Sequence, residues 1–176
     1  MVTERRYAVL TAVGADRPGL VQEISQSIVD SACNLEDSRM AVLGGEFALI
    51  VLLSGGTSAL TRVKEAFPKL ESKLGLRLSM HDTQATPAAS GSSYRLRVTG
   101  VDRPGIVLAV SKLLASRGIN VASLESRVMY APESGTPMFM LLTEIDVPSD
   151  VALSSLKHQL AEVCGAENLD FTIEDD

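Results

Sequence analysis

The sequence contains one short segment twice. Gly14–Val21 reads GADRPGLV, and Gly100–Val107 reads GVDRPGIV, 86 positions later. The same spacing is kept farther along the chain, where Asn34 recurs as Asn120. Self-similarity at a fixed spacing is the signature of a duplicated structural unit. We therefore expect two small domains of one kind in the 176 residues, rather than one larger domain.

The spacing widens beyond these landmarks. Phe47 matches Phe139 at an offset of 92, and residues 76–80 match residues 169–173 at an offset of 93. The second copy therefore carries about six extra residues, and the stretch 130–136, rich in Pro, Ser and Gly, is the best place for them. Between the copies lies a polar tract of small residues without periodicity, typical of a flexible linker. The predicted organisation is a first domain at residues 1–82, a linker at 83–93 and a second domain at 94–176.

Hydrophobic periodicity predicts the same elements in each copy. The expected strands of the first copy are residues 5–13, 35–42, 46–53 and 76–80, and those of the second are 93–99, 121–129, 137–147 and 169–173. Apolar residues at helical spacing predict one helix after the first strand and another after the third. Pro68 falls inside the second helix of the first copy and should kink it or start a new turn there. The expected N-caps of the two later helices are Thr57 or Ser58, and Ser149 or Asp150.

The predicted order is strand, helix, strand, strand, helix, strand, twice over. This is the α+β, ferredoxin-like βαββαβ arrangement, an antiparallel sheet with both helices on one face. The other face of such a sheet is uncovered and its edge strands are unpaired. The two copies are therefore expected to pair with each other or with a second chain, so that an oligomer is expected.

Composition excludes several functional classes. The net charge of −6 disfavours direct binding to nucleic acid, which requires Lys and Arg to neutralise phosphates. The longest apolar run, Phe47–Leu53, is far shorter than the ~20 residues that span a membrane. The first residues do not resemble a secretory signal, so a cytoplasmic location is expected. Cys33 and Cys164 are too few for a disulfide scaffold, and buried free thiols are the expectation.

The repeated Gly-x-Asp-Arg-Pro-Gly segment is the strongest candidate site. Proline favours the first position of a helix, and the glycine that follows leaves the first amides of that helix accessible. Accessible amides at a helix N-terminus form an anion site that suits a carboxylate. The adjacent aspartates could accept a hydrogen bond from a ligand ammonium group, and the two asparagines offer both donors and acceptors. The candidate ligand-binding residues are Asp16, Arg17, Pro18, Gly19, Leu20 and Asn34, and Asp102, Arg103, Pro104, Gly105, Ile106 and Asn120.

A structural explanation of the same residues is also open. The aspartates would then cap the helices, and the asparagines would occupy left-handed turns. Catalysis has little support, because His81 and His158 occupy non-equivalent places and neither has a metal-ligand spacing. Neither cysteine has a motif-like histidine partner. Residues 14–19 also lack the Gly-x-Gly-x-x-Gly pattern of dinucleotide sites. We expect no enzyme activity, no metal and no cofactor.

The Gly-x-Asp-Arg-Pro-Gly-[Leu/Ile]-Val segments, within this order of elements, resemble the ACT domain, a regulatory module that binds small molecules. Residues Gly118–Val121 have the usual Gly-Ile-Asn form of its second motif, whereas Ala32 replaces that glycine in the first copy, so the turn there is expected to differ. Two such domains and nothing else resemble the glycine cleavage system transcriptional repressor family. This resemblance covers nearly the whole chain.

The resemblance implies regulation without catalysis, with an amino acid, glycine being suspected, bound at interfaces between ACT domains. It also implies a protein partner such as a DNA-bound activator. Two alternatives stay open. The chain could be a constitutive ACT-domain scaffold, or a regulatory subunit of an amino-acid biosynthetic enzyme.

Overall fold

The computed structural model describes residues 5–84 and 91–175. The chain divides into two compact units, Met1–Thr86 and Pro87–Asp176, called here unit 1 and unit 2. The predicted linker, residues 83–93, overlaps the strands of both units, because residue 83 ends the last strand of unit 1 and residue 91 begins the first strand of unit 2. The middle of that tract, residues 85–90, lies outside the described residues.

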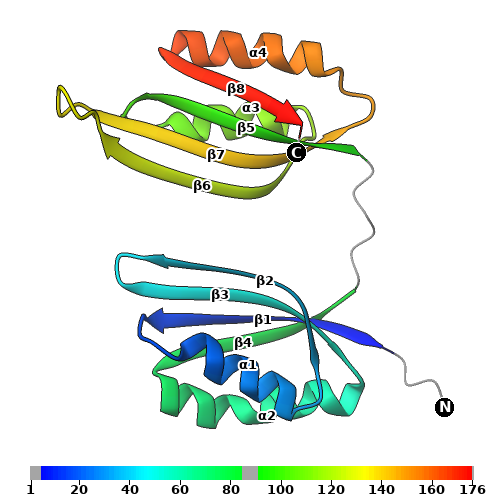
Figure 1. Cartoon of the computed structure of the whole chain (residues 1–176). Coiled ribbons are helices and arrows are strands. Elements are labelled where there is room, and N and C mark those ends of the chain that lie inside the picture. The colour runs from blue at the N-terminus through cyan, green and yellow to red at the C-terminus, as the bar shows by residue number, and fades with distance from the viewer. Residues whose placement is uncertain (1–4, 85–90, 176) are drawn as a thin grey trace. The chain divides into compact units, whose positions relative to one another are not determined.

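Each unit contains four strands and two helices among its described residues (Figure 1). The elements of unit 1 are β1 (Arg6–Ala15), α1 (Leu20–Asp30), β2 (Asn34–Leu43), β3 (Glu46–Gly55), α2 (Thr57–Leu74) and β4 (Leu76–Thr83). Those of unit 2 are β5 (Gly91–Val101), α3 (Ile106–Ser116), β6 (Asn120–Tyr130), β7 (Pro137–Pro148), α4 (Leu153–Ala166) and β8 (Leu169–Asp175). The predicted order of elements is confirmed in both copies.

Both sheets are antiparallel and have the same topology. The strand order is β2-β3-β1-β4 in unit 1 and β6-β7-β5-β8 in unit 2. The two helices of each unit cover one face of its sheet (Figure 1). This is the predicted ferredoxin-like α+β fold. The hairpin of unit 1 closes with Gly44 and Gly45, both at positive φ, whereas six residues, 131–136, separate β6 from β7.

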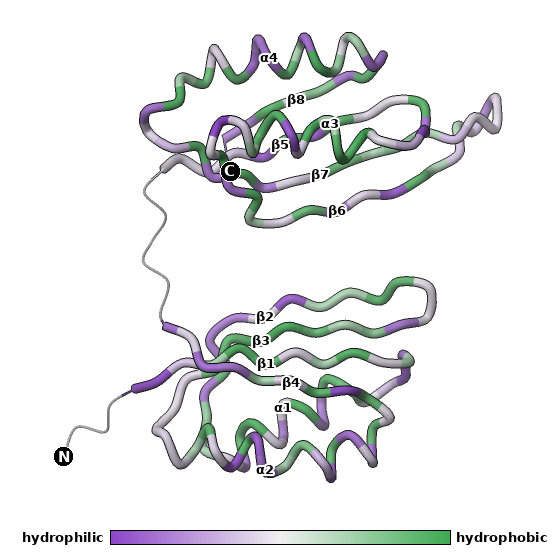
Figure 2. The backbone as a smooth tube through the Cα atoms, turned by 180° about the vertical axis from the view of Figure 1, so that it is seen from behind, coloured by the Kyte–Doolittle hydropathy of each residue, from purple (hydrophilic) through white to green (hydrophobic). Residues whose placement is uncertain are grey.

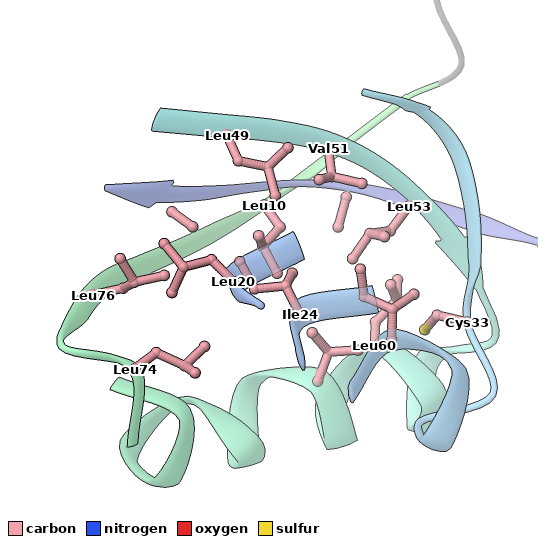
Figure 3. Packing of buried hydrophobic residues seen from close by; sticks show 14 of the residues in the cluster. Leu10, Leu20, Ile24, Cys33, Leu49, Val51, Leu53, Leu60, Leu74 and Leu76 are labelled. Atoms are coloured by element: carbon pink, nitrogen blue, oxygen red, sulfur yellow. The ribbon is translucent and has the colours of Figure 1, made fainter. Parts of the chain in front are cut away.

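The core of unit 1 lies between its sheet and its helices. Alternate residues of β3, from Phe47 to Leu53, are buried, while α1 contributes Leu20 and Ile24 (Figure 3). β3 is strongly hydrophobic along most of its length (Figure 2). Burying a side chain of this size is worth about 1.5–3 kcal/mol, so each of these residues stabilises the unit.

The core of unit 2 repeats that of unit 1. Several core positions recur 86 residues later as buried aliphatic side chains, and four of them are large in both units. The pairs are Leu10 and Leu96, Leu20 and Ile106, Ile24 and Val110, and Ile28 and Leu114. Each core is built from residues of its own unit.

Two features of the later helices bear on local expectations. α2 continues through Pro68, so of the two expected effects the start of a new turn does not occur. The expected N-caps are wrong. The N-caps are Gly56 and Ala152, and neither makes a side-chain capping bond. Thr57 already belongs to α2, and the turn that follows β7 places Ser149 and Asp150 before the cap residue of α4.

Candidate functional site

The two positions of each Gly-x-Asp-Arg-Pro-Gly segment require glycine for different structural reasons. A Cβ atom on Gly14 would lie 2.9 Å from the carbonyl oxygen of Gly75, and one on Gly100 would lie 2.4 Å from a methyl carbon of Leu169. The first glycine therefore permits close packing against the start of the neighbouring strand. The second glycine has φ of 94° at Gly19 and 100° at Gly105, a left-handed conformation that favours glycine.

The helices begin later than the sequence predicts. Gly19 and Gly105 are the N-caps, so Pro18 and Pro104 lie before the helix and are not its first residues. The reason is the left-handed glycine, which separates the proline turn from the helix. The first hydrogen bonds of α1 and α3 run from Glu23 N–H to Gly19 O (3.0 Å) and from Ala109 N–H to Gly105 O (2.9 Å). The amides at the very start of each helix precede these bonds and have no intrahelical acceptor.

The space beside each cap glycine is open. A Cβ atom built on Gly19 or Gly105 would meet no other atom within 4 Å, and neither cap makes a side-chain capping bond. The aspartates therefore do not cap these helices, contrary to the structural explanation of the motif. Their backbone amides pair instead with Gly45 O and Pro137 O. Within residues 5–84 and 91–175, neither Asp16 nor Asp102 makes a side-chain hydrogen bond or ion pair.

The two arginines of the motif hold the loop in place. Arg17 donates to Lys73 O (3.2 Å) at the end of α2, and Arg103 donates to Glu167 O (2.7 Å) at the end of α4. Arg103 also forms an ion pair with the Glu167 carboxylate. Carbonyl groups at a helix C-terminus lack intrahelical donors and carry partial negative charge, so a guanidinium group is a suitable partner. Each arginine thus fastens the start of one helix to the end of the other.

Asn34 lies in a polar cluster at the start of β2. Its Nδ2 donates to Glu36 Oε1 (2.7 Å), and Ser54 Oγ donates to the same oxygen (2.5 Å). Arg5 forms an ion pair with Glu36 and donates through Nε to Ser54 Oγ (3.0 Å). The hydrogen bonds from Ser54 and Asn34, with the Arg5 charge, lower the pKa of Glu36 to about 2. Sequence reasoning missed this cluster.

Asn120 has a carboxylate partner from a different strand. Its Nδ2 donates to Asp146 Oδ2 (2.9 Å), which lies opposite it on β7. Both second strands have a register shift at the same place, between Leu35 and Asp37 and between Val121 and Ser123. The residue inside the shift is Glu36 in unit 1 and Ala122 in unit 2. Each unit therefore pairs its asparagine with a carboxylate, which comes from the same strand in unit 1 and from the neighbouring strand in unit 2.

The structure does not bring each asparagine to the motif loop of its own unit. Asn34 of β2 pairs with Ser54 of β3, and Ser54 pairs with Tyr7 near the start of β1. Asp16, in contrast, follows the end of β1. Nine residues of strand, at about 3.3 Å each, separate the two by roughly 25–30 Å. The same registers place Asn120 and Asp102 at opposite ends of unit 2. A small amino acid cannot contact both groups of one unit.

Two hollows of unit 1 lie away from the predicted residues. One, of about 230 Å³, is on the uncovered face of the sheet and is lined by residues that include Val9, Arg39 and Ile50. The other, of about 400 Å³, runs between α1 and α2. Neither is lined by Asp16 or Asn34.

The groups considered for catalysis are dispersed. His81 lies on β4, and His158 is exposed on α4, 3.4 Å from Glu162 Oε1. Cys33 and Cys164 are buried free thiols, as predicted, and burial raises the pKa of each. No group of His, Cys, Asp and Glu among the described residues has a metal-binding arrangement. No described helix is both long and apolar enough to cross a membrane.

Comparison with known proteins agrees with this architecture. Family models described as ACT domains match residues 6–81 and 94–157. The chain is 30% identical to the glycine cleavage system transcriptional repressor of Escherichia coli over 164 residues, which cover 93% of this chain and 86% of that protein.

Two crystal structures are similar along almost the whole chain. An unknown protein from Galdieria sulphuraria has a TM-score of 0.81 at 30% identity, covering 98% of this chain and 99% of that chain. A structure provisionally described as a glycine cleavage system transcriptional repressor has a TM-score of 0.75 at 28% identity, covering 97% of each chain.

Proposed function

Because the chain belongs to the family of the glycine cleavage system transcriptional repressor, with two ACT domains in tandem, we propose that it senses a free amino acid and passes the signal to a protein partner. The proposed action is regulatory and non-catalytic. Glycine is the proposed signal, and a DNA-bound activator is the proposed partner. The proposed location is the cytoplasm.

The open glycine corner of each unit carries this proposal. Gly19 and Gly105 leave space beside helix amides that have no intrahelical acceptor, and such amides suit a carboxylate. The carboxylates of Asp16 and Asp102 lie in the same segments without a partner in residues 5–84 and 91–175. The helix amides can donate to the carboxylate of a free amino acid, and the aspartate carboxylates can accept from its ammonium group.

The separation within each unit determines how the asparagines could take part. Since Asn34 and Asp16 lie roughly 25–30 Å apart, a site that uses both types of residue requires two ACT domains. The corner of one domain would bind the carboxylate, and the asparagine of another would accept from the ammonium group. Ligand binding would then stabilise one pairing of domains. A coupling of about 1–3 kcal/mol between ligand and partner is enough for a switch.

The net charge of −6 favours an indirect action on transcription. An excess of carboxylates repels phosphates and disfavours the neutralisation on which binding to DNA depends. A protein partner is therefore the better route to a promoter.

A thermal-shift screen of the twenty amino acids tests the proposal. A ligand that binds only the folded state raises the melting temperature, and the increase grows with the logarithm of ligand concentration above the Kd. We expect at least one amino acid to do so at millimolar concentration, and the double variant Asp16→Ala with Asp102→Ala to lose the response. Asp150→Ala removes an exposed carboxylate outside both motifs and should keep it. The sensor function is wrong if no amino acid changes the melting temperature.

A constitutive scaffold is the second candidate, and β2 favours it. All ten residues of this strand are exposed, so its edge is available for pairing. The scaffold predicts no response to amino acids, and it predicts partner binding that the Asp16→Ala, Asp102→Ala variant leaves unchanged. A regulatory subunit of a biosynthetic enzyme would instead co-purify with that enzyme.

A further inference from the structure

Each sheet leaves the face opposite its helices uncovered, and exposed apolar side chains lie on that face (Figure 1). In unit 1, Val13 and Ile50 are about half exposed, and they alternate with the buried residues of β1 and β3. In unit 2, Val101 and Met129 are exposed to a similar extent on the corresponding face. Contiguous exposed apolar surface on a folded domain usually marks a contact with another macromolecule. The two uncovered faces are therefore candidates for a protein interface.

Both faces have a hollow at the same position. The hollow of unit 1, of about 230 Å³, is lined by residues that include Val9, Ile50 and Leu52. In unit 2 a hollow of about 160 Å³ includes Arg95 and Glu144. These two residues pair across β5 and β7 just as Val9 and Leu52 pair across β1 and β3. The two faces therefore have a similar shape and a different chemistry.

The outer strands β4 and β8 carry opposite charge at equivalent positions. On the uncovered face of β4, the titratable side chains are Arg77 and His81. At the equivalent positions of β8, 93 residues later, stand Asp170 and Glu174. Among residues 5–84 and 91–175, Arg77 has no ion-pair partner. This edge of the face is therefore basic in unit 1 and acidic in unit 2.

The remaining charges keep the same sense of contrast. The charges of the other outer strands are paired within each strand, at 2.6 Å on β2 and 3.5 Å on β6. Over the described part of each face, apart from the Glu36 cluster, unit 1 has as many arginines as carboxylates, whereas unit 2 has more carboxylates than arginines. The residues counted are Asp37, Arg39, Glu46 and Arg77 in unit 1, and Arg95, Arg97, Glu125, Arg127, Glu144, Asp146, Asp170 and Glu174 in unit 2.

We infer that the uncovered face of unit 1 binds the uncovered face of unit 2 in a second copy of the chain. Two copies then form two identical contacts about a two-fold axis, which closes the assembly. Pairing of unlike faces places the basic strand β4 against a face with excess carboxylates, whereas pairing of two unit 2 faces would bring like charges together. Pairing of two unit 1 faces would leave the apolar residues of both unit 2 faces exposed.

The area of the faces supports a dimer with two contacts. Four strands spaced about 4.8 Å apart, over the eight residues of β4 at about 3.3 Å each, give a face of roughly 500 Å². One contact of this size is smaller than the roughly 800 Å² per partner of a standard interface, and two contacts exceed it. A second copy supplies both.

Sedimentation equilibrium of the full chain over a range of concentrations tests the inference, and we expect a monomer–dimer equilibrium. Arg77→Glu should raise the Kd of the dimer by about tenfold, because it introduces repulsion into both contacts. Adding Asp170→Arg should restore the dimer, since it returns the balance of charge across each contact. Lys69→Glu makes the same change of charge on α2, in the helix layer, and should leave the Kd unchanged.

The apolar part of the interface is tested without a change of charge. Ile50→Ser removes an exposed apolar side chain from the centre of the unit 1 face and should also weaken the dimer. Val29→Ser removes an exposed valine from α1 and should not. Thermal unfolding of each variant verifies that it is folded before its Kd is compared.

The outcomes that would overturn the inference are distinct. A monomer at every concentration would do so, whether the faces stay free or pair within one chain. A dimer that neither Arg77→Glu nor Ile50→Ser weakens would be formed by another surface, such as the edge of β2. Failure of Asp170→Arg to restore the dimer would indicate that unit 1 faces pair with each other.

The inference does not depend on the sensor function. The dimer described here, without any thermal-shift response to amino acids, would retain the inference and remove the sensor function. A thermal-shift response in a chain that stays monomeric would do the reverse.

Discussion

Ala32 and Gly118 occupy the same position of the repeat and adopt the same backbone conformation. Their φ angles are 58° and 64°, both left-handed. The turn was expected to differ because alanine replaces glycine. The left-handed residue is alike in the two units, but the amide before it bonds to Ser27 O in unit 1 and to Leu114 O in unit 2. The neighbouring core residues Ile28 and Cys33 hold the chain in place on either side, so the alanine accepts an unfavourable conformation.

Ala32→Gly should therefore stabilise unit 1 by about 1 kcal/mol, since the strain of a left-handed alanine exceeds the entropy that glycine adds to the unfolded chain. The reverse change, Gly118→Ala, should destabilise unit 2 by a similar amount, because a Cβ atom there meets nothing within 4 Å and strain is the only cost. Urea unfolding of the two variants measures both effects. Two changes of the same sign would contradict this account.

Glu36 should make unit 1 sensitive to acid. Its pKa is lowered from an ordinary value near 4.5 to about 2, so the unfolded chain binds the proton more readily than the folded chain. Stability from this group is therefore complete above about pH 5 and is lost as the pH falls toward 2. Glu36→Gln should give a flatter dependence of stability on pH in that window, measured by urea unfolding at several pH values. A slope equal to that of the wild type would show that other carboxylates are responsible.

The sequence contains no local signal for the Glu36 cluster. Arg5, Glu36 and Ser54 are separated by 31 and 18 residues, and the pairing of both β1 and β2 with β3 brings them together. In contrast, Asp16 and Asp102 could be predicted because both lie within one repeated local motif. Residues that act through long-range contacts are visible only once the register of the sheet is known.

At the scale of elements, the type and order of helices and strands could be predicted, but the helix starts could not. Periodicity reflects which face of an element is buried, and that pattern is strong in both copies. The N-caps depend instead on the conformation of single residues. Gly19 takes a left-handed φ that moves the helix start past Pro18, and Gly56 caps α2 without a side chain. Composition alone does not distinguish these starts from the Ser and Thr caps that were expected.

Replacement of Pro68 should stabilise α2. This residue is exposed, and its lack of an N–H group removes one hydrogen bond from the middle of an 18-residue helix. Pro68→Ala should restore a bond to the carbonyl of Lys64 and stabilise unit 1 by about 1–3 kcal/mol. Thermal unfolding of the variant measures the change, with Ala66→Pro as the opposite control. A loss of stability in Pro68→Ala would mean that the ring makes contacts that alanine cannot replace.

At the scale of the molecule, the order of elements already implies the separation of the motif loop from the asparagine. A strand followed by a helix and then by a second strand returns the chain to the end of the sheet where it began, so Asp16 and Asn34 must lie at opposite ends. The motif loop and the asparagine were both predicted to bind the same amino acid, but the topology holds them apart within one unit. The proposed site therefore requires a pair of domains.

Separate cores also predict separate unfolding. Leu10 and Leu96 occupy equivalent positions, are 2% and 0% exposed, and pack only with residues of their own unit. Leu10→Ala should destabilise unit 1 by about 2–5 kcal/mol, because it removes buried surface and leaves a cavity. Amide hydrogen exchange on the full chain should show faster exchange in the strands of unit 1 and unchanged exchange in those of unit 2. Leu96→Ala should show the reverse. If either substitution accelerated exchange equally in both units, the two cores would unfold as one cooperative structure, and the account of separate cores would be wrong.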